Sequence, residues 1–150
     1  MPEPAAPLGR VLVVDDVPEI LLIAESLLCQ SGYEVVAVRS GARALKELRA
    51  GAFDLVLTDI EMPDATGVDI LRAVRERDLD VPVLIMTGHP GLETAVQALD
   101  HGALRYLLKP VRGEALVEAV ASAVRLHQMA RLKREALTHL GVPSRWSGAP

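Results

Sequence analysis

Polar side chains able to carry out phosphoryl chemistry follow short apolar runs along the chain. They are Asp15 and Asp16 after the first run, Asp59 at the end of the third, Thr87 after the fourth and Lys109 after the fifth. Apolar runs bounded by turn residues indicate buried parallel strands, whose carboxyl ends meet at one edge of a sheet. We therefore expect these side chains to converge. Phosphoryl transfer requires such groups for positioning and charge neutralisation.

The predicted cluster has a defined chemistry. Three aspartates at one site repel one another unless a cation lies between them. Hard carboxylate oxygens without a neighbouring His or Cys favour Mg²⁺, with Mn²⁺ as an alternative, over zinc. With the cation bound, the Asp59 carboxylate can attack phosphorus in line and form an acyl phosphate. Lys109 would then pair with one phosphate oxygen, and Thr87 would donate a hydrogen bond to another.

Short apolar runs, typical of buried strands, alternate along the chain with segments whose apolar residues recur at helical spacing. Strands are expected at 11–14, 34–38, 55–58, 81–86 and 105–108, and helices at 18–31, 41–50, 67–77, 92–101 and from 113 onwards. This alternation predicts an α/β fold with a five-stranded, parallel, doubly wound sheet covered on both faces. In the flavodoxin-like (βα)5 order 2-1-3-4-5, the loops after strands 1 and 3 are neighbours, so the aspartates meet.

Length and composition limit the classes of protein and partner. The 150 residues are half apolar, which is enough for one globular unit with its own core. A net charge of -4 argues against non-specific binding to nucleic acid or to anionic membranes. No apolar run approaches the roughly 18 residues that span a bilayer. We therefore expect a cytoplasmic protein with no direct nucleic-acid partner and no membrane partner.

The last helix is expected to be long, because residues 114–140 contain no Gly or Pro. Its apolar face narrows after Val124 to a stripe flanked by charges, which is typical of a helix that leaves its domain and pairs with another. The Pro- and Ala-rich residues 1–8 are interpreted as a disordered leader, not a signal peptide. The expected organisation is thus a leader at 1–8, a domain at 9–126, a helical linker or dimerisation segment at 127–140, and a flexible tail at 141–150.

At this point the motifs resemble the receiver domain of bacterial two-component response regulators. The resemblance covers residues 9–126 and rests on Asp15-Asp16, on Asp59 with Met62-Pro63 and Gly67, on Thr87, and on Lys109-Pro110. It implies that Asp16 and Asp59 bind Mg²⁺ directly and that Asp15 binds it mostly through water. The backbone carbonyl of Glu61 would complete the protein ligands. The resemblance also implies a cis peptide bond between Lys109 and Pro110.

The resemblance further implies a signalling function without enzymatic turnover. Asp59 would take a phosphoryl group from the phosphohistidine of a sensor histidine kinase or a phosphotransfer protein and lose it slowly. Thr87 would then move toward the phosphate, and Tyr106 would turn inward as a second part of the switch. The face formed by the helix at 92–101, the strand at 105–108 and the last helix would change shape. A homodimer through this face and the last helix is expected, or control of an output domain outside this chain.

Other reactive side chains have simpler interpretations. Cys29 is interpreted as an apolar neighbour within the helix at 18–31. His89, in the loop Gly88-His89-Pro90-Gly91, could serve as a second phosphoacceptor or a metal ligand, but it is interpreted as solvated. His101, at a helix end, and His127, on a late helix face, are given no functional role.

Alternative functions fit parts of the pattern. A metal-dependent aspartyl-phosphate phosphatase or hydrolase would need a second acid to protonate its leaving group, and none is evident beside Asp15 and Asp16. A phosphorylation-independent interaction module would be expected to lack Asp59, Thr87 or Lys109, and all are present. A dinucleotide-binding domain is disfavoured because Gly-x-Gly-x-x-Gly is missing after the first strand.

Overall fold

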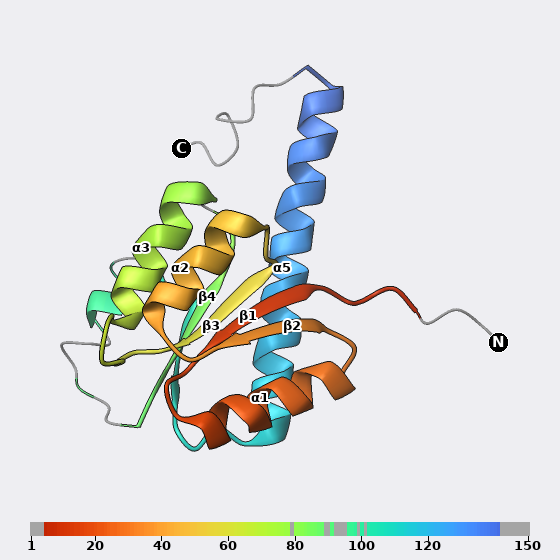
Figure 1. Ribbon diagram of the computed structural model, residues 1–150. Helices are drawn as coiled ribbons and strands as arrows, with labels where there is room; N and C mark the ends of the chain where they lie inside the picture. Colours follow the sequence, from red (N-terminus) through yellow and green to blue (C-terminus); the bar gives the residue numbers. More distant parts are fainter. Residues whose placement is uncertain are drawn as a thin grey trace.

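The computed structural model describes residues 5–78, 80–88, 91, 96–98, 100 and 102–141. Within them, five parallel strands form one sheet in the order β2-β1-β3-β4-β5 (Figure 1). The strands are β1 (Arg10–Val14), β2 (Glu34–Val38), β3 (Leu55–Asp59), β4 (Val83–Thr87) and β5 (Arg105–Leu108). The predicted α/β class and the predicted strand order are therefore confirmed.

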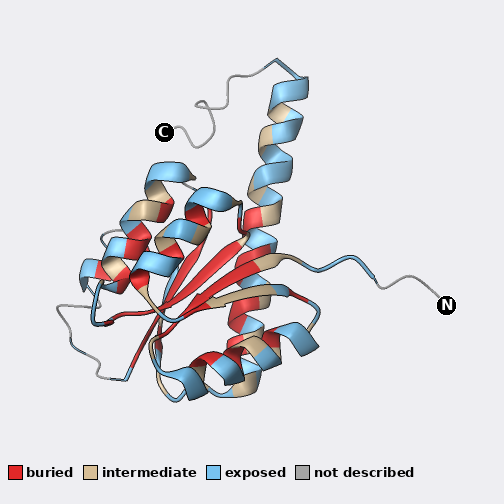
Figure 2. Cartoon of the chain, viewed as in Figure 1, coloured by how far each residue is buried: buried red, intermediate tan, exposed pale blue. Residues whose placement is uncertain are grey.

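The helices cover both faces of the sheet (Figures 1 and 2). They are α1 (Pro18–Gln30), α2 (Gly41–Ala50), α3 (Gly67–Arg77) and α5 (Gly113–His139). Because side chains alternate along a strand, Leu12 and Val14 pack with residues of α2 and α3, whereas Val11 and Val13 pack with residues of α1 and α5. The central strands β3 and β4 are buried at every position, which is why their sequences are almost entirely apolar.

The strand register brings the carboxyl ends of the strands level with one another. Val14 pairs with Thr58, Asp59 pairs with Met86, and Thr87 pairs with Leu108. The residues that follow β1, β3 and β5 therefore lie at the same edge of the sheet. We call this edge, which carries the ends of β1, β3, β4 and β5, the carboxyl edge. The edge at which these strands begin is the amino edge.

The connection after β3 is held tightly to the end of that strand. A Cβ atom at Gly67 would lie 2.8 Å from the backbone oxygen of Asp59, so only glycine fits at the start of α3. Thr66 caps this helix through a capping box with Asp69. The close approach of α3 therefore depends on the glycine in the predicted motif.

Helix α5 is longer than the sheet is deep. Its 27 residues span about 40 Å at 1.5 Å per residue, whereas a five-residue strand such as β3 spans about 17 Å. The helix begins at the carboxyl edge, crosses the sheet, and continues past the amino edge (Figure 1). Leu126, Met129 and Leu132 are more than half exposed along its later part. The predicted extended helix is therefore present.

Some predicted features differ or lie elsewhere. Cys29 lies in α1 but is exposed, because the buried positions of that helix are Leu21, Ala24 and Leu28. The expected helix at 92–101 falls mostly outside the described residues, although residues 96–98 and 100 are helical. His89 and His101 also lie outside the described residues.

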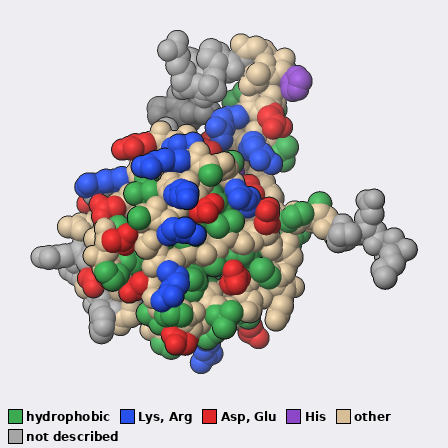
Figure 3. Space-filling model, viewed as in Figure 1, with side chains coloured by type: hydrophobic (Ala, Val, Ile, Leu, Met, Phe, Trp, Pro, Cys, Tyr) green, Lys and Arg blue, Asp and Glu red, His purple; other side chains and the backbone are tan. Residues whose placement is uncertain are grey.

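The distribution of surface charge and the composition of the helices indicate which kinds of partner the chain could bind. On the face shown in Figure 3, Lys and Arg side chains are interspersed with Asp and Glu. Among the described residues, no helix is long and apolar enough to cross a membrane.

At the end of the expected leader, the Leu8 backbone N–H donates to the Gly32 carbonyl, and the Leu8 carbonyl accepts from Gln128 Nε2. Leu8 is therefore attached to the folded domain.

Candidate functional site

Three aspartates meet at the carboxyl edge. Asp59 is the last residue of β3, and Asp15 and Asp16 directly follow β1, the neighbouring strand. Each of the three offers a carboxylate oxygen, and these oxygens lie within 4.8 Å of one another. Asp15 is fully buried, Asp59 is 8% exposed and Asp16 is half-buried. Strand order thus brings together residues that are 44 positions apart in the chain.

Lys109, directly after β5, supplies a positive charge to this cluster. Its Nζ atom donates to Asp15 Oδ2 at 2.7 Å and lies 3.4 Å from Asp59 Oδ2. The Lys109 backbone N–H donates to the Thr87 carbonyl at 2.7 Å, which fixes the start of the β5–α5 connection against the end of β4. The Lys109–Pro110 peptide is cis, as expected.

The charges in the cluster do not balance. Burial raises the pKa of Asp59; Lys109 opposes this effect, whereas the charges on Asp15 and Asp16 add to it. Three carboxylates therefore share one ammonium group. A divalent cation with a preference for oxygen ligands would remove the surplus negative charge, so the donor set fits Mg²⁺ or Mn²⁺.

The two predicted switch residues lie on adjacent strands. Thr87 ends β4 and is 2% exposed, whereas Tyr106 lies in β5 and is half-buried against the core under α2 and α3. Ile85 pairs with Tyr106 and Thr87 pairs with Leu108, so Thr87 and Tyr106 belong to the same face of the sheet, two positions apart. Thr87 is thus the nearer of the two to the carboxyl edge.

The loop after Asp59 is anchored by a residue that the motifs do not identify. Asp64 accepts hydrogen bonds from the backbone N–H groups of Gly41 and Ala42 at 3.0 and 2.9 Å, at the start of α2. These bonds lower the pKa of Asp64. Within the same loop, Glu61 forms an isolated antiparallel bridge with Thr66. The loop that carries the Glu61 carbonyl is therefore tied to both α2 and α3.

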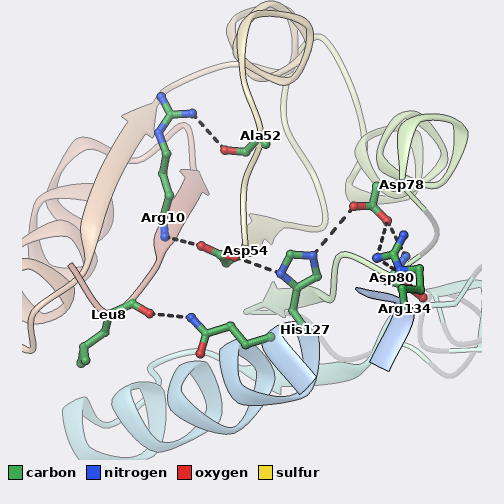
Figure 4. Close-up of polar contacts among 9 residues, drawn as sticks. Leu8, Arg10, Ala52, Asp54, Asp78, Asp80, His127 and Arg134 are labelled. Atoms are coloured by element: carbon green, nitrogen blue, oxygen red, sulfur yellow. Dashed lines mark hydrogen bonds and ion pairs between the residues drawn. The ribbon is translucent and has the colours of Figure 1, made fainter. Parts of the chain in front are cut away.

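A second polar cluster lies at the amino edge, where His127 is 5% exposed (Figure 4). Its ring contacts Asp54, before β3, and faces Asp78, after α3. This residue was given no role from the sequence. Its spacing from Leu116, Val120 and Val124 is the signal that places it on the buried face of α5.

Comparisons with known proteins agree with this geometry. Residues 11–121 match the family described as Response regulator receiver domain. The luminescence regulatory protein LuxO of Vibrio campbellii is 36% identical over 124 residues, which are 83% of this chain and 27% of LuxO. The transcriptional regulatory protein ZraR of Klebsiella oxytoca is 40% identical over 114 residues, 76% of this chain and 26% of ZraR. The chain thus spans about a quarter of the length of these curated relatives.

A solved structure is similar over most of the chain. The solution structure of the beryllofluoride-activated NtrC4 receiver domain dimer superposes with a TM-score of 0.74 at 31% identity. The superposition covers 79% of this chain and 98% of that chain.

Proposed function

The chain belongs to the response regulator receiver domain family, and on that premise we propose that Asp59 is its phosphoryl acceptor. Receiver domains of two-component response regulators are signalling domains rather than turnover enzymes. The proposed donor is the phosphohistidine of a sensor histidine kinase or of a phosphotransfer protein. The observation that carries the proposal is the position of Asp59 at the end of β3, with Lys109 Nζ 3.4 Å from its Oδ2.

The proposed step uses residues already in place. An Asp59 carboxylate oxygen forms a bond to phosphorus, while the bond from phosphorus to the donor imidazole nitrogen breaks and its electron pair stays with the imidazole. Lys109, now bound to Asp15, moves to pair with an oxygen of the transferred group. The Thr87 hydroxyl donates a hydrogen bond to another oxygen. Mg²⁺ or Mn²⁺, held by Asp15, Asp16, Asp59 and the Glu61 carbonyl, would supply charge neutralisation.

The proposed response travels through β5. Thr87 and Tyr106 share a face of the sheet, so a movement of Thr87 toward the acyl phosphate leaves space that the Tyr106 ring can fill. Leu104 and Leu108 are 41% and 54% exposed beside this switch. We propose that the face expected from the helix predicted at 92–101, together with β5 and α5, changes shape and controls a partner or an output domain.

We propose that the receiver transmits its signal to a partner or an output domain through the end of α5. We propose that residues 9–126 form the receiver and that the end of α5 serves as a linker or as a dimerisation segment. The exposed apolar residues Leu126, Met129 and Leu132 support this role. LuxO and ZraR, which are named as regulatory proteins, are about four times longer than the part this chain matches. A location in the cytoplasm is part of the same proposal.

The acceptor proposal is tested with a small-molecule phosphoryl donor. Incubation of the chain with Mg²⁺ and acetyl phosphate should add one phosphoryl group, detected by intact mass, and chelation of the cation should prevent the addition. Asp59→Asn should show no addition. Asp69→Asn, on the exposed side of α3, is a matched control that keeps a capping side chain and should behave as the wild type. An unmodified wild type, or a fully modified Asp59→Asn, would refute the proposal.

The dimer proposal is tested by sedimentation velocity with and without beryllofluoride. We expect association on activation, because the NtrC4 receiver domain, a structural relative, forms a dimer in that state. Met129→Glu places a charge on the exposed apolar side of α5 and should prevent association. Lys46→Glu, exposed on α2, should not. A wild type that stays monomeric when activated would contradict the proposal.

A further inference from the structure

His127 lies between two carboxylates from different parts of the chain (Figure 4). Its Nδ1 atom is 3.0 Å from Asp54 Oδ1, and its Nε2 atom is 3.8 Å from Asp78 Oδ2. The imidazole is 6% exposed, whereas the Asp54 and Asp78 side chains are 16% and 37% exposed. One buried ring therefore faces a carboxylate at each of its two nitrogens.

The hydrogen bonds of Asp54 determine where the first proton lies. Asp54 Oδ2 accepts the backbone N–H of Arg10 at 2.8 Å, and Oδ1 contacts His127 Nδ1. An ionised carboxylate can only accept hydrogen bonds, so Nδ1 carries a proton and donates it. A neutral ring would then present the lone pair of Nε2 to the Asp78 carboxylate. Only the imidazolium is attracted to both acids.

Charged groups from the neighbouring elements complete this environment. From α5, Arg134 Nη2 contacts Asp80 Oδ2 at 2.6 Å and lies 3.9 Å from Asp78 Oδ1. From α3, Arg75 donates to the Gly102 carbonyl and lies near enough to Asp78 and Asp80 to feel their charge. From β1, Arg10 donates to the Ala52 carbonyl and pairs with Glu34 at 3.7 Å. Among the side-chain types in this set, imidazole is the one whose charge ordinarily changes between about pH 5 and 8.

His127 lies at the point where α5 leaves the sheet, so its contacts can affect the part of the helix that extends beyond the domain. The helix passes the amino edge of the sheet at His127, and Arg134 follows about two turns later on the same side. Between the later part of α5 and Asp78 there is a cleft of about 420 Å³, lined also by Arg131 and Glu135. Within residues 128–139, Arg134 contacts Asp78 and Asp80, and Gln128 donates to the Leu8 carbonyl.

We propose that His127 is a protonation-dependent clasp that fixes the direction in which residues 128–139 leave the domain. The imidazolium joins α5 to both Asp54 and Asp78. The neutral ring keeps the Asp54 contact and releases the Asp78 contact, so the end of α5 becomes freer to move. This inference does not depend on phosphorylation of Asp59. Where the end of α5 connects to a partner or an output domain, the clasp would make that connection sensitive to pH.

The contact between His127 and Asp78 should weaken as the pH rises. The clasp is closed where the imidazole is protonated and opens as the pH rises, within the range of about pH 5 to 8 in which imidazoles titrate. The expected behaviour is therefore tightest packing of the end of α5 at mildly acidic pH.

Amide hydrogen exchange of the full chain tests the clasp. Protection factors, which correct for the intrinsic effect of pH on exchange, would be compared for residues 128–139 between about pH 5.5 and pH 8. In the wild type we expect protection to fall by about fivefold as the pH rises. His127→Gln can donate to Asp54 but cannot be charged, so its protection should not depend on pH. His139→Gln, an exposed histidine on the same helix, should behave as the wild type.

A second variant keeps the test decisive if His127→Gln folds poorly. Asp78→Asn keeps the Asp54–His127 hydrogen bond and removes the charge that faces Nε2, so it should also abolish the pH dependence. The dependence should persist in Asp59→Asn, which separates the clasp from the phosphoacceptor proposal. A wild type with constant protection, or an Asp78→Asn variant with the wild-type dependence, would overturn the clasp.

Discussion

Each edge of the sheet holds carboxylates beside a nitrogen-bearing side chain, Lys109 at one edge and His127 at the other, yet the two edges are organised differently. At the carboxyl edge, Asp15, Asp16 and Asp59 share the single ammonium group of Lys109. At the amino edge, Asp54 and Asp78 face His127, and the Arg134 guanidinium pairs with Asp80. The first cluster carries surplus negative charge, whereas arginines surround the second.

This difference indicates the role of each edge. A surplus of negative charge costs stability until a cation arrives, so the carboxyl edge is organised to receive a ligand. The amino edge has partners for its charges within the chain, and the helix that supplies them covers it. The carboxyl edge uses an ammonium group, whereas the amino edge uses an imidazole, the side-chain type that ordinarily changes charge between about pH 5 and 8. We propose that the carboxyl edge responds to a bound cation and a phosphoryl group, and that the amino edge responds to protons.

The substitution Lys109→Met tests the role of the carboxyl edge and should have the largest effect. It removes the ammonium group that, among the residues described in the structure, contacts Asp15 and Asp59. We expect phosphorylation by acetyl phosphate to slow by on the order of 100-fold or more, because a positioned charge that stabilises the transferred group is lost. The rate is measured by intact mass at saturating Mg²⁺. Lys133→Met, exposed on α5, should react at the wild-type rate. Equal rates in all three proteins would contradict the role of Lys109.

The substitution His127→Ala tests the amino edge and should have an effect of intermediate size on the free energy of unfolding. His127→Ala removes a buried ring and leaves the Asp54 carboxylate without one of its donors. We expect the free energy of unfolding to fall by about 3 kcal/mol, measured by urea denaturation with Mg²⁺ absent. His139→Ala, at the exposed end of the same helix, should change it by less than about 0.5 kcal/mol. Phosphorylation of folded His127→Ala should continue, since the two edges are chemically separate.

The smallest expected effect concerns the pKa of Asp59. Because this pKa is raised in the folded state, the folded chain holds the Asp59 proton more tightly than the unfolded chain does. Stability should therefore decrease as the pH rises from the ordinary Asp range through the raised pKa. We expect Asp59→Asn to be more stable than the wild type at neutral pH without Mg²⁺, by less than the effect of His127→Ala.

The same urea titrations at acidic pH provide the control for this prediction. When Asp59 is protonated in both the folded and the unfolded state, the advantage of Asp59→Asn should disappear. Added Mg²⁺ should reduce that advantage at neutral pH, because the wild type binds the cation more tightly. A wild type that is more stable than Asp59→Asn at neutral pH without Mg²⁺ would show that the three carboxylates do not burden the folded state.

The sheet could be predicted from sequence because burial on both faces leaves little freedom in residue choice. The expected strand at 81–86 shifts to Val83–Thr87 in the structure. Pro82 has no N–H to donate, although its carbonyl accepts from Val56 N, and pairing with β5 continues to Thr87. The ends of strands are thus decided by neighbouring strands, which a local hydrophobic pattern does not contain.

The two edges were not equally predictable. Asp15, Asp16, Asp59 and Lys109 follow strands, so strand order alone brings them together. The contact between His127 and Asp54 joins residues 73 positions apart and depends on how α5 is rotated about its axis. The bond from Asp64 to α2 likewise depends on the path of a loop. Contacts made by side chains across loops and helix faces require tertiary packing, which no motif encodes.

The length of α5 on either side of His127 has a mechanical consequence. From Gly113 to His127 the helix is about 21 Å long, and from His127 to His139 it is about 18 Å long. If the contacts of His127 act as a fulcrum, the two arms are nearly equal. A sideways shift of the α5 start, beside the acidic cluster, would then appear at the far end with almost the same amplitude and in the opposite direction. Release of the fulcrum would uncouple the two ends.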